Sequence, residues 1–157
     1  MLQINALSLP FTLDDMILAD IVRSISSGGL PEYFGVIQIA ILDDPTMREL
    51  NRSYRGMDST TDVLSFGYED NYTVPRDTTV GEIVLSPSLL ESQAFERGYT
   101  LQEEFYRLVI HGILHILGFD HETDADYASM YAHEYRVISI LQKHYHLLEH
   151  ETPLTHE

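Results

Sequence analysis

The sequence contains no cysteine among its 157 residues, and it has few basic residues. Without cysteine, neither disulfide bonds nor thiolate metal sites can form, so any bound metal must be held by imidazole and carboxylate groups. Nine Lys and Arg residues stand against 25 Asp and Glu residues, which gives a formal net charge of −16. This balance argues against a protein that grips long nucleic acids by neutralising their phosphates. DNA is therefore not an expected partner.

Long apolar runs are also missing. No segment approaches the roughly 20 apolar residues that are needed to span a bilayer. The first basic residue is Arg23, so the chain lacks the basic start of a signal peptide. We therefore expect a cytoplasmic protein with no membrane partner. The length and the 44% hydrophobic content predict a single domain over residues 1–157, with a frayed tail from about residue 149.

Strand-like and helix-like segments alternate along the chain, and the last three are helical. Short β-branched and apolar runs predict strands, at residues 2–7, 36–42, 61–66 and 82–86. Capping residues, glycines and proline positions predict helices, at about 12–29, 43–56, 87–97, 100–117 and 124–148. Thr12 is expected to cap the first helix, and Thr100 with Glu103 to form a capping box. The polar segment 68–81 is typical of a surface loop. The predicted fold class is α+β: one mixed sheet of about four strands packed with about five helices.

The stretch HGILHILGFDH, residues 111–121, has the histidine and glycine spacing of the metzincin zinc proteases. Four residues of a helix turn through about 400°, so His111 and His115 lie one turn apart on the same face. Gly118 permits a left-handed turn that brings His121 back toward this pair. Three neutral imidazoles with an open fourth position are typical of a catalytic zinc site. We therefore predict a zincin-like metal helix that binds one Zn²⁺, or another divalent metal, through His111, His115 and His121.

The motif lacks the glutamate that serves as general base in those proteases, because position 112 is glycine. A glycine inside a helix costs about 1 kcal/mol relative to alanine. Two explanations for Gly112 are open: a substrate that passes close to the backbone, or tight packing of the helix against another element. Helix propensity favours glutamate over glycine, so we expect the Gly112→Glu variant to fold. We also expect this variant to keep its metal and to gain no peptidase activity.

Several segments of the chain resemble the YbeY family of bacterial single-strand endoribonucleases and rRNA maturation factors. HGILHILGFDH is similar to the family's HGxLHLxGYDH motif, and LNRSYRGMDSTTDVLSF (50–66) and GEIVLS (81–86) are similar to two further family segments. The resemblance covers residues from about 36 to 140 in matching order. Three positions depart from the family pattern: Thr60, Glu82 and Phe119. Because Phe119 has no hydroxyl, no mechanism should depend on a tyrosine at that position.

The resemblance implies a metal-dependent endoribonuclease that cleaves single-stranded RNA in rRNA maturation, at the 3′ end of 16S rRNA and in ribosome quality control. It implies that His111, His115 and His121 hold the metal, and that Arg55 and His111 are catalytic. Arg55 is expected in the loop after the arginine-rich helix, where its planar guanidinium suits bidentate contact with a phosphate. The nucleophile is either the 2′-hydroxyl of the RNA or a water molecule on the metal. The implied partners are pre-rRNA, a small-subunit ribosomal protein and an assembly GTPase.

Two other functions are open at this point: a metal-stabilised ribosome assembly factor without turnover, and a metal-dependent hydrolase of peptides or esters. Some residues near the motif also have open roles. Asp120 is either a turn residue or a partner that orients a ligand histidine, and Glu82 and Ser65 are candidate pocket residues. His133 and Met130 lie in the last predicted helix. We expect a solvated or packed role for His133 and core packing for Met130, rather than metal binding.

Overall fold

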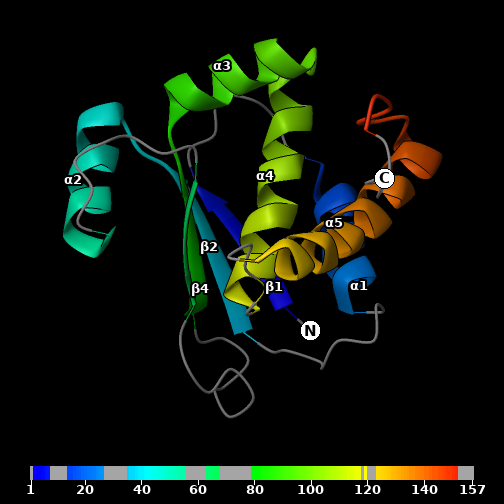
Figure 1. Ribbon diagram of the computed structural model, residues 1–157, viewed down its shortest axis with the longest axis horizontal. Helices are drawn as coiled ribbons and strands as arrows, with labels where there is room; N and C mark the ends of the chain where they lie inside the picture. The colour runs from blue at the N-terminus through cyan, green and yellow to red at the C-terminus, as the bar shows by residue number, and fades with distance from the viewer. Residues whose placement is uncertain are drawn as a thin grey trace.

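The computed structural model describes residues 2–7, 14–26, 35–55, 63–67, 79–117, 119 and 123–151 (Figure 1). Its strands are β1 (Leu2–Leu7), β2 (Gly35–Ile41), β3 (Val63–Gly67) and β4 (Thr79–Leu85). Its helices are α1 (Asp15–Ser26), α2 (Asp44–Arg55), α3 (Pro87–Arg97), α4 (Leu101–Ile116) and α5 (Asp124–Tyr145). Within these residues, the prediction of a small α+β fold with five helices is confirmed. No helix in this part of the chain combines the length and the apolar content that a membrane crossing requires.

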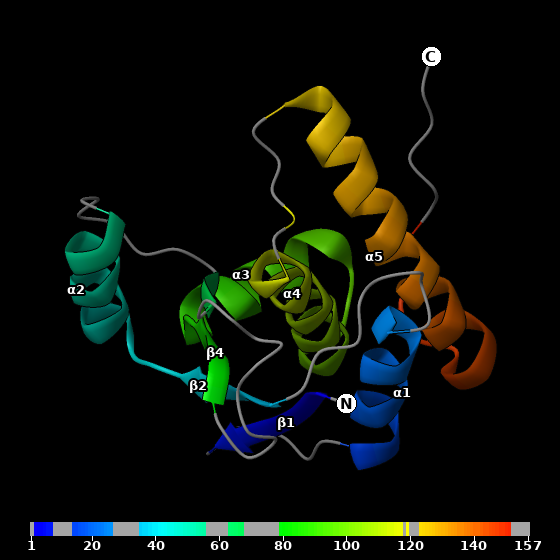
Figure 2. The ribbon, with the colours of Figure 1, turned by 90° about the horizontal axis from the view of Figure 1, so that it is seen from below.

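The strands form one sheet in the order β1-β2-β4-β3. β1, β2 and β4 are parallel, whereas β3 runs antiparallel to β4. Residues two apart in a strand share a face, and one face of the two central strands is fully buried, at Ile37, Ile39, Ile83 and Leu85. In Figure 2, α4 lies over one face of the sheet, with α1 and α5 beside it. The core therefore lies between this sheet face and the helices.

α4 is the central helix of the core. Six of its apolar side chains are at most 1% exposed: Phe105, Leu108, Val109, Ile110, Ile113 and Leu114. The predicted capping box at its start is confirmed. The Thr100 hydroxyl accepts from the Glu103 backbone N–H at 3.1 Å, and the Glu103 carboxylate accepts from the Thr100 N–H at 3.0 Å. The site histidines are therefore carried by a helix that is buried almost all round and capped at its start.

Several of the predicted helix ends were wrong, among them both ends of the first helix, which finishes at Ser26. The first helix begins at Asp15, because the Asp14 side chain accepts a hydrogen bond of 2.8 Å from the Met16 N–H. The predicted cap, Thr12, lies outside the described residues. The last helix ends at Tyr145, three residues earlier than predicted, because His146 adopts a left-handed conformation with φ 56°. These errors concern only which residue begins or ends a helix, and none changes the order of the elements.

α2 stands apart from α1, α4 and α5 in both views (Figures 1 and 2). Its first residue, Asp44, accepts hydrogen bonds from the hydroxyls of Ser86 at 2.6 Å and Ser88 at 2.7 Å, where β4 leads into α3. These two hydrogen bonds, the one from Ser86 foremost, lower the pKa of Asp44. The helix ends at Arg55. Arg55 is thus the last residue of a helix, which corrects its predicted place in the following loop.

Other predicted boundaries differ by a few residues. β4 begins at Thr79, so the last three residues of the predicted surface loop belong to a strand. Residues 68–78 of that loop lie outside the described part of the chain. β3 begins at Val63 and ends at Gly67, where a strand over residues 61–66 was predicted. The strands therefore lie at the predicted places in the chain, and only their first and last residues differ from the prediction.

The chain after α5 folds back onto that helix. Leu148 is fully buried, and the Gln142 side-chain amide donates to the carbonyls of Leu148 at 2.8 Å and Glu151 at 3.0 Å. This segment is therefore anchored through Glu151, two residues beyond the predicted start of fraying. The fraying of residues 152–157 stays a prediction, because they lie outside the described residues.

Replacing Thr100 by alanine should lower the free energy of unfolding by about 1 kcal/mol, because the N–H of Glu103 loses its acceptor. Urea denaturation measures this change. Thr100→Ser is the matched control, since it keeps the hydroxyl and should stay within about 0.5 kcal/mol of the unchanged protein. An equal loss of stability in both variants would show that the hydroxyl does not cap the helix.

Candidate functional site

The imidazoles of His111 and His115 converge on one side of α4. Their Nε2 atoms are 3.1 Å apart, and the ring planes cross at 76°. Two imidazoles on one tetrahedral zinc, with bonds of about 2.0–2.1 Å, place their nitrogen atoms about 3.3 Å apart. The two Nε2 atoms therefore already have nearly the separation that one zinc ion requires of two ligands. The predicted pairing of these histidines on one helix face is confirmed.

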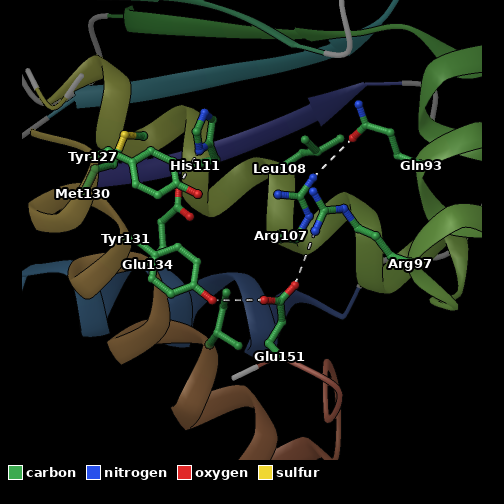
Figure 3. A pocket seen from close by; sticks show the side chains of 11 residues that line it. Gln93, Arg97, Arg107, Leu108, His111, Tyr127, Met130, Tyr131, Glu134 and Glu151 are labelled. Atoms are coloured by element: carbon green, nitrogen blue, oxygen red, sulfur yellow. Dashed lines mark hydrogen bonds and ion pairs between the residues drawn. The ribbon is translucent and has the colours of Figure 1, made fainter. Parts of the chain in front are cut away.

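His111 also has a carboxylate partner that the sequence analysis missed. Its Nδ1 is hydrogen-bonded to Oε1 of Glu134 on α5, 23 positions further along the chain (Figure 3). Glu134 is only 7% exposed. One signal in the sequence was available: Glu134 lies four residues from both Met130 and Ile138, on the stripe that α5 buries. A glutamate in such a stripe needs a partner, because an isolated buried charge is costly.

A cavity of about 280 Å³ opens between α3, α4 and α5 beside the His111–Glu134 pair (Figure 3). Its walls include Arg97, Arg107, Tyr127, Tyr131 and Glu151. Arg107 donates to the buried carboxylate of Glu104 at 2.9 Å and to the Gln93 side chain at 3.2 Å. Arg97 lies 3.7 Å from the Glu151 carboxylate. Both arginines of this cavity therefore have a carboxylate partner.

Tyr131 and Glu151 both line this cavity. The Tyr131 hydroxyl donates to the Glu151 carboxylate at 3.4 Å. Burial of the phenol, followed by the nearby Glu151, raises the pKa of Tyr131 to about 12. Tyr131 therefore keeps its proton at neutral pH and serves as a hydrogen-bond donor here.

The packing roles predicted for His133 and Met130 are confirmed. Met130 is 2% exposed. The half-buried His133 ring packs against Phe119, with ring centroids 4.7 Å apart. Burial, and then the charge of Arg136, lower the pKa of His133. His133 is therefore a neutral packing residue at neutral pH.

Gly112 is buried in α4, between Leu108 and Ile116, which lie one turn away on either side and are 1% and 7% exposed. α4 lies against β3 and β4. Of the two explanations for this glycine, its burial supports tight packing of the helix over passage of a substrate.

The other predicted site residues are not brought together by the described structure. His121, Asp120 and Gly118 lie outside the described residues, as do the side chains of Arg55 and Ser65. Glu82 is described and has an exposed side chain on β4. Within the described ranges, no group of three His, Cys, Asp or Glu side chains is gathered as a metal site. The described part of the site therefore consists of His111, His115 and Glu134, which is hydrogen-bonded to Nδ1 of His111.

Converging imidazoles backed by a buried carboxylate are typical of hydrolytic metal centres. The family described as "Endoribonuclease YbeY" matches residues 13–142, most of the chain. The chain therefore belongs to the YbeY family of endoribonucleases.

Curated relatives named Endoribonuclease YbeY show the extent of the similarity. The relative from Moorella thermoacetica is 39% identical over 110 residues, which are 66% of this chain and 70% of that protein. The relative from Leptospira interrogans is 39% identical over 122 residues, covering 68% and 86% of the two chains. The relative from Roseiflexus castenholzii is 37% identical over 135 residues, covering 83% and 82%.

One solved structure extends the likeness to the fold. A protein from Thermotoga maritima, determined in solution, matches this chain with a TM-score of 0.53 and 22% identity. The match covers all of both chains. At this identity it supports the fold alone.

Proposed function

We propose that this protein is a metal-dependent endoribonuclease that cleaves single-stranded RNA during rRNA maturation. The observation that carries the proposal is the convergence of the His111 and His115 Nε2 atoms, 3.1 Å apart, in a chain of the YbeY family. The relatives that match are named as endoribonucleases, which supports RNA as the substrate.

His111 and His115 fit a divalent metal, because two imidazole nitrogens about 3 Å apart can both bind one Zn²⁺ once the proton between them is released. His121 completes the proposed ligand set, with one ion per chain. When bound, the metal supplies Lewis-acid polarisation of a phosphate oxygen and lowers the pKa of a coordinated water. The protein's own share is to hold the imidazoles in place on a buried helix.

Arg55 supplies the second element of the proposed mechanism. Its planar, permanently charged guanidinium suits bidentate contact with the phosphate and stabilises the negative charge that develops during cleavage. No general base is assigned at position 112, because a buried glycine occupies it. This separates the proposed chemistry from that of the metzincin proteases.

We further propose that the enzyme acts at the 3′ end of 16S rRNA and in ribosome quality control. A small-subunit ribosomal protein and an assembly GTPase are the proposed partners. The net charge of −16 supports delivery through proteins, since an acidic enzyme gains no electrostatic steering toward RNA.

Elemental analysis of the untagged protein should find about one divalent ion per chain, and His115→Ala should lose it together with RNA cleavage. His144→Ala is the matched control: it removes an exposed histidine of α5 and should change neither property. Absence of stoichiometric metal, or unchanged metal in His115→Ala, would contradict the proposed site. Peptide hydrolysis without RNA cleavage would overturn the proposed function.

A further inference from the structure

Glu134 is a carboxylate on the apolar stripe of α5. Its neighbours one turn away, Met130 and Ile138, are each 2% exposed, and Glu134 itself is 7% exposed. A carboxylate in such a place is stable only when it is paired and hydrogen-bonded. The burial of Glu134 therefore calls for a specific partner.

That partner is an imidazole rather than a guanidinium. Oε1 of Glu134 meets Nδ1 of His111. Arg107, a cation that lines the same cavity, directs hydrogen bonds to Glu104 and Gln93. The contact between α5 and the ligand helix at this point is therefore made between Glu134 and His111.

The contact fixes which nitrogen of His111 carries the proton. A carboxylate only accepts hydrogen bonds, so Nδ1 donates and the lone pair is left on Nε2. Nε2 faces the Nε2 of His115 at 3.1 Å. The Glu134 carboxylate thus sets the tautomer of His111 and the orientation of its imidazole ring.

We propose that Glu134 is a positioning residue of the metal site: it holds His111 with its Nε2 lone pair aimed at the point shared with His115. This inference rests on the proposed function, because it requires His111 to be a metal ligand. Glu134 is bound on the Nδ1 side of the ring, away from Nε2, so it acts through His111 and does not serve as the base that position 112 lacks.

The test is zinc affinity, measured by competition with a chromophoric chelator on protein stripped of metal and titrated with Zn²⁺. Glu134→Gln should weaken zinc binding by about 10- to 100-fold, the usual effect of removing a carboxylate behind a ligand histidine. Glu134→Leu keeps the volume and suits the apolar stripe. It should fold and should weaken zinc binding at least as much.

A second readout reports the tautomer directly. Two-bond ¹H–¹⁵N correlation spectra of the metal-free protein should show His111 protonated at Nδ1, and Glu134→Leu should shift it toward the Nε2-protonated form. A purely structural role would leave this signature unchanged. Wild-type zinc affinity and an unchanged tautomer in both variants would overturn the inference.

Glu104→Gln is the matched control, because Glu104 is a fully buried glutamate that pairs with Arg107 instead of a histidine. It should lower the melting temperature and leave zinc affinity and the His111 tautomer unchanged. Loss of zinc affinity in this control as well would assign the effect to general destabilisation and overturn the inference. If His111→Ala binds zinc like the unchanged protein, the proposed metal site itself fails, and the role of Glu134 fails with it.

Discussion

Replacement of Arg55 by alanine is expected to lower the rate of RNA cleavage by about 10²-fold or more, the typical cost of losing one charged contact to a transition state. Metal content should not change, since Arg55 is not among the proposed ligands. Folding should also be largely preserved. Arg55 is the last residue of α2, where alanine is a good helix former and the lost helix-dipole contact is worth about 0.3–1 kcal/mol.

The measurement is single-turnover cleavage of a single-stranded RNA oligonucleotide by protein of known metal content. Arg55→Lys should restore little activity, because an ammonium group cannot present a planar fork to a phosphate. Arg23→Ala, which removes an exposed arginine on α1, should cleave at the wild-type rate. Full activity in Arg55→Ala would remove this arginine from the proposed mechanism and would favour an assembly role without turnover.

Gly112→Glu is expected to lower the free energy of unfolding by about 3–5 kcal/mol, a large fraction of the roughly 5–15 kcal/mol that is typical of a single domain. Gly112 is buried in α4, so a glutamate there becomes a buried charge without a partner. This revises the expectation drawn from the sequence alone. Helix propensity favours glutamate by only about 0.5 kcal/mol, and the desolvation of a carboxylate outweighs that gain.

Chemical denaturation of Gly112→Glu and of the unchanged protein measures this difference in the free energy of unfolding. Gln102→Glu provides the matched control, because it adds a glutamate to an exposed position in the first turn of the same helix. An acid there interacts favourably with the helix dipole and should leave stability equal or slightly higher. A Gly112→Glu variant as stable as the control would show that the site accommodates a carboxylate. Our packing explanation for the glycine would then be wrong.

The features that were predicted correctly from the sequence are local ones. The capping box of α4 needs only Thr100 and Glu103, three residues apart. The pairing of His111 with His115 follows from the helical repeat. Each of these depends on a few neighbouring residues and on backbone geometry that any helix shares, so no knowledge of the fold was required.

The features that were missed depend on competition or on distance. Thr12 and Asp14 are both good capping residues, and nothing local decides between them. His146 ends α5 in a left-handed conformation that non-glycine side chains rarely adopt. The Glu134 contact forms only because α5 lies beside α4, which is a property of the packed fold. The position of Glu134 among the apolar residues of α5 indicated that it needs a partner, but it did not indicate that the partner is His111.

Because α2 is hydrogen-bonded to Ser86 and Ser88 at its first residue, Asp44, a small tilt there moves the other end of the helix by a larger distance. Arg55 lies eleven residues beyond Asp44, which at 1.5 Å per residue is about 16 Å along the helix axis. A tilt of about 1° at the attached end therefore displaces the far end by about 0.3 Å, and a tilt of about 2° exceeds the roughly 0.5 Å within which catalytic groups must be held. In the proposed mechanism, the hydrogen bonds from Ser86 and Ser88 to Asp44 thus help to set the position of the far end of α2, where Arg55 lies.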